Sequence, residues 1–250
     1  MSISIEPLDC GSLTASLSAF EDGAADTPIT LPVPAWLIRH PEGTVLLDTG
    51  MHTDLSHPSS LLSVISDFFE VGLDQKQLVS ERLKSSGVDP SDIDFVVLSH
   101  LHFDHCGGLA QIPNARVVVQ KAEWAAGFDD DLTSANSFNP RDYDLGHEVV
   151  LADGEHDIFG DGLVTCIPTP GHTTGHQSLR VRLGSSEVVF CCDCAYFTRT
   201  LDGGVLPPFG YDREEQAKSI QRLVDMRSAG ALLVPGHDSA AVAALPALLQ

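Results

Sequence analysis

The chain has 250 residues, of which 43% are hydrophobic and 20% are charged, so we expect one globular domain over residues 1–250 with a sizeable core. Its 14 Lys and Arg residues face 35 Asp and Glu residues, and the formal net charge of −21 disfavours nucleic acid and anionic membranes as partners. The first residues lack the basic segment and long apolar core of a signal peptide, and no apolar run approaches the ~18 residues of a membrane-spanning helix.

The positions of the six cysteines indicate whether the protein works in an oxidising or a reducing cellular compartment. Cys191, Cys192 and Cys194 crowd into four positions, which is a poor layout for a disulfide framework, so we expect a reducing, cytoplasmic environment. This cluster could bind a metal through thiolates. It could also supply small apolar side chains at the end of a strand, and that second interpretation is favoured.

The first part of the chain predicts a hairpin and a helix. Residues 31–40 and 44–47 have the composition of strands and are joined by the turn Pro-Glu-Gly at 41–43. Residues 59–72 hold a mixed set of apolar side chains, most of which core packing explains. Residues 75–86 place apolar side chains on one face and are followed by glycine, which predicts a short surface helix.

The stretch around the next predicted strand is the most informative. Residues 95–98 are apolar and rich in β-branched side chains, which predicts a buried strand. Four potential metal ligands follow it within six residues, namely His100, His102, Asp104 and His105. Two histidines two positions apart project to the same side of an extended segment and can bind one ion. A bend at the adjacent Asp and His can turn both toward a second ion, and loops at strand ends commonly carry such sites.

Beyond this loop, residues 106–108 predict a tight turn into a helix, and residues 121–126 suit a helical turn. Residues 129–147 are polar and irregular, and their sequence indicates no function. Residues 212–215 resemble a capping box that begins a helix with one apolar face, which ends near Gly230. The strands expected in this part are residues 116–120, 163–167, 177–183, 187–192 and 231–234.

Four of the predicted strands end in the same way, because a residue that can bind a metal closely follows each of them. Open sheets carry their chemistry at one end of the strands, where loops meet on a rigid base. Any one of these residues alone would more often be structural, but four such endings in one chain favour a shared site. The four residues are His100, His172, Asp193 and His237.

These motifs resemble those of a known family. The run His-Leu-His-Phe-Asp-His at residues 100–105 resembles the His-x-His-x-Asp-His signature of the metallo-β-lactamase superfamily. Together with the Gly-Gly that follows, this run has a sequence similar to that of the N-acyl homoserine lactonases in that superfamily. Gly-His-Thr-Thr-Gly-His at residues 171–176 resembles a second motif, Asp193 matches the bridging carboxylate, and residues 236–238 match the last motif.

The resemblance implies an α/β fold, namely the αβ/βα four-layer sandwich in which helices flank two mixed β-sheets. It also implies two divalent ions, of which Zn²⁺ is favoured and Fe, Mn or Co are alternatives. The protein would be a monomer or a homodimer. By resemblance, the first ion takes His100, His102, His172 and Asp193, and the second takes Asp104, His105, Asp193 and His237.

The implied activity is the opening of the lactone ring of N-acyl homoserine lactones, which is a quorum-quenching reaction. Two neighbouring ions can hold a hydroxide that attacks the carbonyl carbon, and their attraction strengthens as charge moves onto oxygen. Tyr196 matches a tyrosine whose phenol is directed at the substrate carbonyl, although by itself it could be a loop tyrosine with an ordinary hydrogen bond. Asp104 is the expected proton carrier to the leaving ring oxygen.

Further candidates follow from the same resemblance. Phe68 and Phe69 fall in a region that walls the substrate pocket of such lactonases, and Phe103 in the first motif is a third candidate for substrate contact. Asp48 could be a turn or cap residue at a strand end, but the resemblance favours a supporting contact to the metal site. His176 is expected to support the site rather than to bind a metal.

Other activities stay open on these residues. A lactonase for a heterocyclic lactone such as 4-pyridoxolactone would use the same seven ligands, and a glyoxalase-II-like thioester hydrolase uses the same framework. The acidic charge disfavours the nucleases of the superfamily, and the ligand set disfavours its β-lactamases and diiron oxygen reductases. A metal-binding or ligand-sensing protein without catalysis is disfavoured because all seven ligand positions are filled.

Three residues depart from the family pattern. Thr174 stands where proline is common, which predicts a looser loop around His172. Cys106 and Cys194 flank ligands at positions where small residues are usual, so oxidation there would disturb the site.

Overall fold

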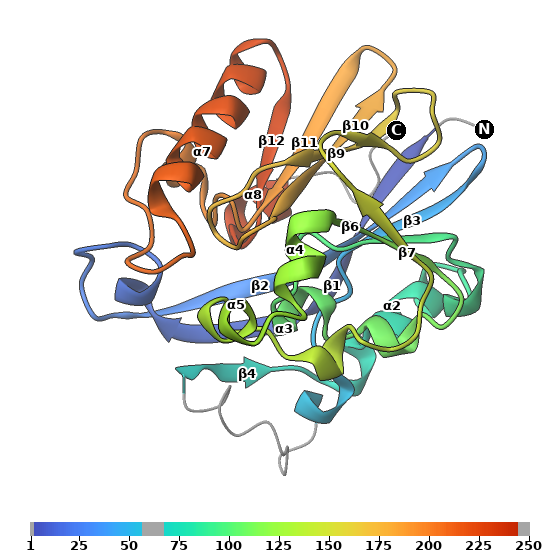
Figure 1. Ribbon diagram of the computed structural model, residues 1–250, viewed down its shortest axis with the longest axis horizontal. Coiled ribbons are helices and arrows are strands. Elements are labelled where there is room, and N and C mark those ends of the chain that lie inside the picture. The colour runs from blue at the N-terminus through green and yellow to red at the C-terminus, as the bar shows by residue number, and fades with distance from the viewer. Residues whose placement is uncertain (1–2, 57–67, 245–250) are drawn as a thin grey trace.

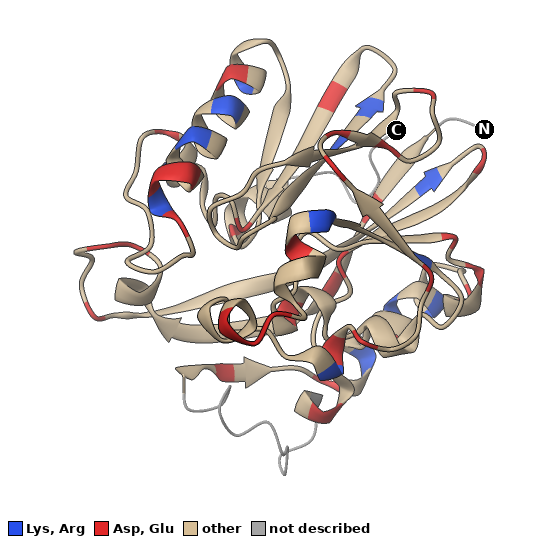
Figure 2. Ribbon diagram, viewed as in Figure 1, with Lys and Arg blue, Asp and Glu red and all other residues tan. Residues whose placement is uncertain are grey.

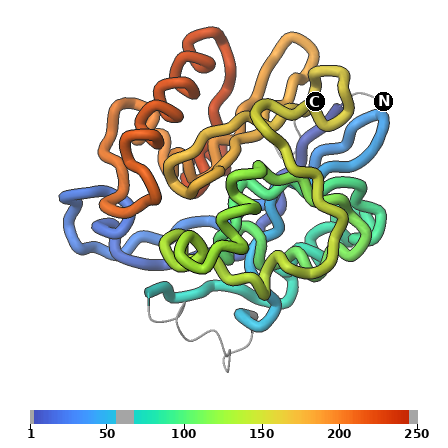
Figure 3. Tube along the Cα trace, in the orientation of Figure 1, coloured from blue at the N-terminus to red at the C-terminus, as the bar shows by residue number. Residues whose placement is uncertain are grey.

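The computed structural model describes residues 3–56 and 68–244 of the chain. Two β-sheets pack face to face, and helices cover the outer side of each (Figure 1). The chain builds these layers in order, so that the strands up to residue 152 form one sheet and the strands from residue 156 onward form the other, as the blue-to-red colouring lets the reader follow (Figure 3). The αβ/βα sandwich predicted from the sequence is confirmed.

Within residues 3–56 and 68–244, the first sheet has seven strands in the order β4-β1-β2-β3-β5-β6-β7. The pairs among β4, β1, β2 and β3 are antiparallel, whereas β3, β5, β6 and β7 pair in parallel. The hairpin predicted around residues 41–43 is confirmed as β2 and β3. The strands are β1 (Ser4–Ser16), β2 (Pro28–His40), β3 (Gly43–Leu47), β4 (Glu70–Gly72), β5 (Phe95–Val97), β6 (Arg116–Gln120) and β7 (Val149–Ala152).

The second sheet has five strands in the part of the chain that the structure describes, in the order β12-β11-β10-β9-β8. Its β11 and β12 are parallel, and the other neighbouring pairs are antiparallel. The strands are β8 (His156–Asp157), β9 (Val164–Pro168), β10 (Gln177–Leu183), β11 (Ser186–Cys192) and β12 (Leu232–Pro235).

The longest helix, α7, begins where Asp212 accepts hydrogen bonds of 3.0 Å from two backbone N–H groups of the first turn. None of the helices in the described residues is long and apolar enough to cross a membrane. The α-helices whose bounds the structure describes are α2 (Val79–Ser85), α3 (Phe103–Cys106), α4 (Lys121–Ala126), α5 (Asp130–Ala135), α6 (Thr198–Leu201), α7 (Arg213–Ser228) and α8 (Ser239–Ala244). The short 3-10 turns are η1 (Leu17–Ala19), η2 (Thr53–Ser56), η3 (Gln75–Gln77), η4 (Pro90–Asp92), η5 (Leu109–Gln111) and η6 (Pro140–Asp142).

The alternation of side chains along β2 explains the layers. Trp36 and Ile38 face the apolar layer between the two sheets, and Ala35 and Leu37 face the helices on the other side of the strand. Successive side chains of a strand point to opposite faces, so an apolar residue at every position means that both faces are covered. Each fully buried Leu or Ile contributes about 1.5–3 kcal/mol to folding, which anchors the strand ends that carry the polar loops.

The cysteine cluster belongs to this apolar packing. Cys192 faces the layer between the sheets, and Cys191 and Cys194 pack with Leu223 beneath α7. All six cysteines are buried and free. The interpretation of Cys191 and Cys192 as small apolar residues at a strand end is therefore supported over a thiolate site.

Several local predictions differ from the structure. Residues 75–86 form η3 and then α2, because Leu78 is extended with φ −58° and ψ 136° and separates them. Residues 106–108 lead into the 3-10 turn η5, but an α-helical turn, α3, already begins at Phe103, so Asp104 and His105 lie on a helical turn. The polar segment 129–147 contains α5 and η6. Part of the apolar set expected in 59–72, up to residue 67, lies outside the described residues.

Candidate metal centre

Four ligand-bearing loops meet at one edge of the sandwich. β9 and β11 both pair antiparallel with β10, and β12 runs parallel to β11, so the C-terminal ends of β9, β11 and β12 lie on the same side. The loop after β5 reaches this edge from the other sheet, where the backbone N–H of Gln177 donates to the carbonyl of Ser99 at 2.9 Å. Buried strands thus fix the starting points of all four loops.

The structure brings the seven predicted ligands together in two clusters. In each cluster the ligand atoms lie within 4.8 Å of one another. The first cluster is His100, His102, His172 and Asp193, and the second cluster is Asp104, His105 and His237.

Asp193 faces both clusters with one oxygen each. Its Oδ2 lies 3.4 Å from Nε2 of His172 and 3.8 Å from Nε2 of His100. Its Oδ1 lies 3.0 Å from Nε2 of His237 and 3.3 Å from Nε2 of His105. The carboxylate is only 3% exposed. It is therefore the one side chain that both clusters share.

Each of the five clustered histidines has one ring nitrogen that faces away from its cluster. An oxygen atom that can accept a hydrogen bond lies next to each of these outer nitrogens, which fixes the tautomer of the ring. In that tautomer His102 donates through Nε2 to the Asn136 carbonyl at 2.7 Å, and His237 donates through Nδ1 to the Pro32 carbonyl at 2.7 Å. Nδ1 of His100 lies 2.9 Å from the Ser99 hydroxyl, and Nδ1 of His105 lies 2.8 Å from the Asp48 carboxylate. Nδ1 of His172 lies 3.5 Å from the Tyr196 hydroxyl.

The inner nitrogens then converge as lone-pair donors. Nδ1 of His102 lies 2.9 Å from Nε2 of His100 and 3.0 Å from Nε2 of His172, although none of these atoms carries a hydrogen in this tautomer. Nε2 of His105 and Oδ1 of Asp193 are buried without a hydrogen-bond partner in the described structure. Buried lone pairs that face one another need a cation between them, and imidazole with carboxylate is the donor set of zinc and similar divalent ions. The residues fit a metal pair.

The electrostatics differ between the clusters. Burial lowers the pKa of His100, His102 and His172, so these imidazoles are neutral, as metal binding requires. Burial also acts on His105 and His237, but the nearby carboxylates outweigh it and raise the pKa of both. These carboxylates therefore favour positive charge next to the two rings.

Asp48, for which the sequence suggested a supporting contact, lies beside both clusters. Its Oδ1 accepts from the backbone N–H of Ser99 at 2.8 Å, and its Oδ2 accepts from the Ser99 hydroxyl and from Nδ1 of His105, each at 2.8 Å. Ser99 in turn contacts His100, so one carboxylate orients a ligand of each cluster. Asp48 adopts φ 58°, an unfavourable backbone region that these buried bonds hold in place.

His176 belongs to neither cluster. Its Nδ1 contacts the Thr169 hydroxyl at 2.9 Å, and its ring centre lies 5.2 Å from that of His100. Burial lowers the pKa of His176 to about 3, so the ring is a neutral packing partner behind the site.

An aromatic row begins at Tyr196. This buried ring meets Phe20 edge-on at 5.5 Å, and Phe69 lies 6.4 Å from Phe20 and 5.9 Å from Phe103. Burial raises the pKa of Tyr196 well above its usual value, so the phenol keeps its proton. Phe68 is 74% exposed and takes no part in the ring contacts of this row.

Four residues near the site were not predicted, namely Phe20, Ser99, Glu123 and Asn136. Ser99 could have been found because it directly precedes His100. The other three come from distant segments, and no local pattern links them to the motifs.

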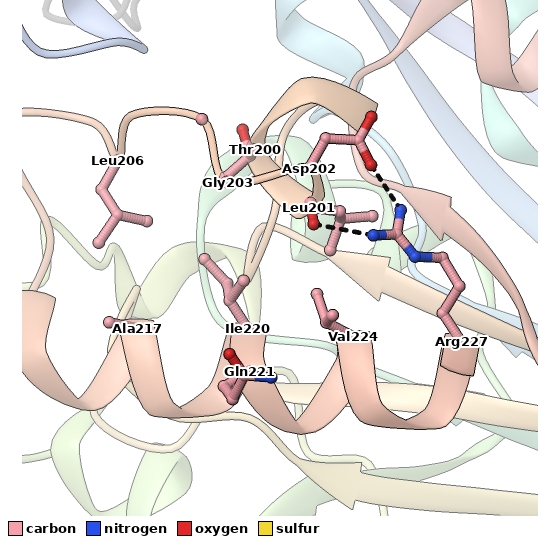
Figure 4. Close-up of a pocket in the computed structure, with 11 residues that line it drawn as sticks. Thr200, Leu201, Asp202, Gly203, Leu206, Ala217, Ile220, Gln221, Val224 and Arg227 are labelled. Carbon is pink, nitrogen blue, oxygen red and sulfur yellow. Dashed lines mark hydrogen bonds and ion pairs between the residues drawn. The ribbon is translucent and has the colours of Figure 1, made fainter. Parts of the chain in front are cut away.

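The structure also contains a cavity of about 490 Å³ between α6, the loop that follows it and α7. Leu206, Ile220 and Val224 line it, and Arg227 closes one end through a bond of 2.7 Å to Asp202 (Figure 4). None of the seven predicted ligands lines this cavity.

An αβ/βα sandwich that carries two adjacent clusters of metal-ligating side chains defines the class of protein. The model of the metallo-beta-lactamase superfamily matches residues 29–237. The N-acyl homoserine lactonase AttM of Rhizobium johnstonii is 35% identical over 219 residues, which cover 84% of this chain and 83% of that protein. The chain therefore belongs to the metallo-β-lactamase superfamily and, within it, to the family of the N-acyl homoserine lactonases.

Solved structures share the fold. An N-acyl homoserine lactone hydrolase with the product N-hexanoyl-L-homoserine at its catalytic metal centre superposes with a TM-score of 0.86, at 23% identity and over 98% of both chains. AidC, a dizinc quorum-quenching lactonase, superposes with a TM-score of 0.73, at 18% identity, over 98% of this chain and 89% of its own.

Proposed function

We propose that the protein opens the lactone ring of N-acyl homoserine lactones with two divalent metal ions. The observation that carries this proposal is the position of Asp193, whose two oxygens face two separate clusters of metal ligands beside the phenol of Tyr196. The relationship to AttM, an N-acyl homoserine lactonase, supports the choice of substrate.

The first ion would be held by the first cluster and the second ion by the second cluster, with Asp193 common to both. When bound, such a pair supplies an activated water near neutral pH and polarises the carbonyl oxygen of the substrate. We favour zinc, because the ligands are imidazoles and carboxylates and because AidC is a dizinc lactonase.

Tyr196 is placed to stabilise the reacting carbonyl. In the tautomer described above, Nδ1–H of His172 faces the Tyr196 oxygen at 3.5 Å, so the phenolic hydrogen is free to donate elsewhere. The raised pKa of the phenol keeps that hydrogen in place. A donor directed at an oxygen that gains negative charge lowers the barrier more than it strengthens substrate binding.

Asp104 is the proposed proton carrier. Its Oδ2 lies 3.5 Å from Nε2 of His105 and 3.7 Å from Nε2 of His237, so its carboxylate lies next to the inner nitrogens of the second cluster. Opening the ring leaves an alkoxide on the former ring oxygen, and this alkoxide must take up a proton. Asp104 can receive a proton from the attacking water and pass it to that oxygen.

The acyl chain would lie along the aromatic row. Phe69 and Phe103 are partly exposed and would contact the chain, and the buried rings of Phe20 and Tyr196 pack behind them. Acidic and basic side chains are spread over the loops, over several helices including α5 and α7, and over strands such as β10 and β11 (Figure 2). A neutral lactone with an apolar tail fits this combination, and the negative net charge does not repel it.

We further infer that residues 1–250 act as one hydrolase domain, as a monomer or homodimer in the cytoplasm. The six buried free thiols support a reducing compartment. Nucleic acid is not expected as a partner because the net charge is −21.

The proposal is tested by following acid release from a panel of lactones with the purified protein. We expect the highest kcat/KM on N-acyl homoserine lactones, loss of activity after chelation, and recovery when Zn²⁺ is restored. A higher kcat/KM on 4-pyridoxolactone or on a thioester would assign one of the alternative activities. Activity that survives complete removal of the metals would contradict the two-metal centre.

A further inference from the structure

A buried carboxylate lies behind the first cluster and takes no part in the proposed chemistry. Glu123 on α4 is 0% exposed, and no Lys, Arg or His forms a salt bridge with it among the described residues. Burial raises the pKa of Glu123 to about 7, and hydrogen bonds from its neighbours oppose that rise. A carboxyl group without a cationic partner is costly to bury, so its hydrogen bonds indicate what it is for.

Glu123 connects the two loops that carry the histidines of the first cluster. Its Oε1 accepts from the backbone N–H of Leu101 at 3.1 Å, between His100 and His102. Its Oε2 accepts from the Thr173 hydroxyl at 2.9 Å and from the backbone N–H of Gly175 at 2.6 Å, in the loop that follows His172. One side chain therefore sets the separation of these loops.

The contact is tight. A Cβ atom on Gly175 would collide with the backbone nitrogen of Glu123, so only glycine lets the loop lie this close to α4. The loop cannot shift toward the helix, and the three hydrogen bonds keep it from moving away. The spacing of the first cluster is fixed from both directions.

Asn136 joins the same two loops at a second point. Its carbonyl accepts from His102, its side-chain NH₂ donates to the Thr174 hydroxyl at 3.0 Å, and its side-chain oxygen accepts from the Thr174 N–H at 3.2 Å. Threonine in place of the common proline supplies that N–H, so the departure at position 174 is bonded rather than loose.

The second cluster is supported from other places. His105 is held by Asp48, and His237 by the carbonyl of Pro32. Glu123 makes none of these bonds. A change at Glu123 should therefore reach the first cluster and leave the second largely as it was.

We propose that Glu123 is a positioning residue that sets the metal affinity of the first cluster alone, an inference that rests on the proposed two-metal centre. It acts by holding the loop of His100 and His102 against the loop of His172. Residues of this kind, which orient metal ligands without touching the metal, commonly change metal affinity about 10- to 100-fold.

The test is Glu123→Gln, which keeps the size of the side chain. The amide offers one oxygen in place of two, so at least one of the three donors loses its acceptor. Crystals equilibrated with limiting zinc give the occupancy of each site from anomalous scattering. We expect the ratio of first-cluster to second-cluster occupancy to fall, with zinc about 10- to 100-fold weaker at the first cluster in a competition titration.

Asp142→Asn is the matched control, because Asp142 is also a buried carboxylate, at 2% exposure, and has an oxygen without a hydrogen bond in the described structure. This control should keep the occupancy ratio of the natural protein. Thr173→Val is the milder second variant if Glu123→Gln does not fold, since it removes one donor to Glu123 and should lower the same ratio less.

An unchanged ratio, or equal losses at both clusters, would overturn the positioning role. The measurement needs no substrate, so it separates this proposal from the proposed function. If the natural protein binds two zinc ions and hydrolyses no lactone, the function is wrong while the role of Glu123 can still be read from the occupancies. If the natural protein hydrolyses lactones and Glu123→Gln keeps the occupancy ratio of the natural protein, only the positioning role is wrong.

Discussion

Replacing Asp193 by asparagine removes the contact that makes the two clusters one centre. The side chain keeps its shape, so the fold around this 3% exposed position should persist. One of its two oxygens becomes an NH₂ group, which has no lone pair to offer a metal. The oxygen that remains can face the histidines of one cluster only, because the two oxygens now serve His172 and His237 separately.

The size of the effect follows from the ligand count. Two of the seven clustered side chains, Asp104 and Asp193, are anionic, so the substitution halves the negative charge that faces the cations. Loss of a residue that merely supports a ligand weakens metal binding about 10- to 100-fold. Asp193 is itself a proposed ligand, so we expect more than about 100-fold weaker binding at one site, which is ~2.7 kcal/mol.

Metal analysis after dialysis, with lactone hydrolysis on the same sample, measures this effect. We expect the metal content of Asp193→Asn to fall from two ions per chain toward one, and kcat to fall with it. Asp153→Asn removes a carboxylate that is 84% exposed and serves as the control with unchanged metal. Two firmly bound ions in Asp193→Asn would refute the shared-carboxylate reasoning.

Tyr196→Phe should lower kcat about 10- to 100-fold with both metals retained, because it removes one donor to the developing oxyanion. Tyr211→Phe is the control variant. Loss of metal in Tyr196→Phe would contradict the assignment. Iodoacetamide at about pH 8 should leave the folded protein unlabelled and active, since burial raises the pKa of Cys10 and Cys166 to about 12 and leaves only about one thiol in 10⁴ ionised. Fast labelling in a mass spectrum, with activity lost and metal kept, would instead indicate a thiol mechanism. Asp212→Ala should lower the free energy of unfolding by ~1 kcal/mol in urea, because α7 loses its N-cap, and an unchanged midpoint would contradict this.

The ligands could be predicted because each follows a short apolar strand whose pattern is visible locally. His100, His172, Asp193 and His237 each follow such a strand by one to four residues, and the strands themselves were placed to within about two residues. Whether a strand is buried shows in the apolar pattern of its own residues, and a single sequence contains that local pattern.

The parts that could not be predicted depend on contacts between distant segments. Glu123 reads as an ordinary helix residue, and only the fold shows that residues 101 and 175 meet its two oxygens. Asn136 lies in a segment whose sequence gave no function, yet its carbonyl orients His102. β1 was not predicted, although it pairs with β2 along most of its length. Such pairings arise from chain topology, which local periodicity does not encode.

The most direct test of the central claim is an anomalous diffraction map of crystals grown with Zn²⁺. The account predicts two peaks about 3.5–4 Å apart, one among His100, His102 and His172 and one among Asp104, His105 and His237, with Asp193 between them. A single peak, or peaks away from these side chains, would contradict it.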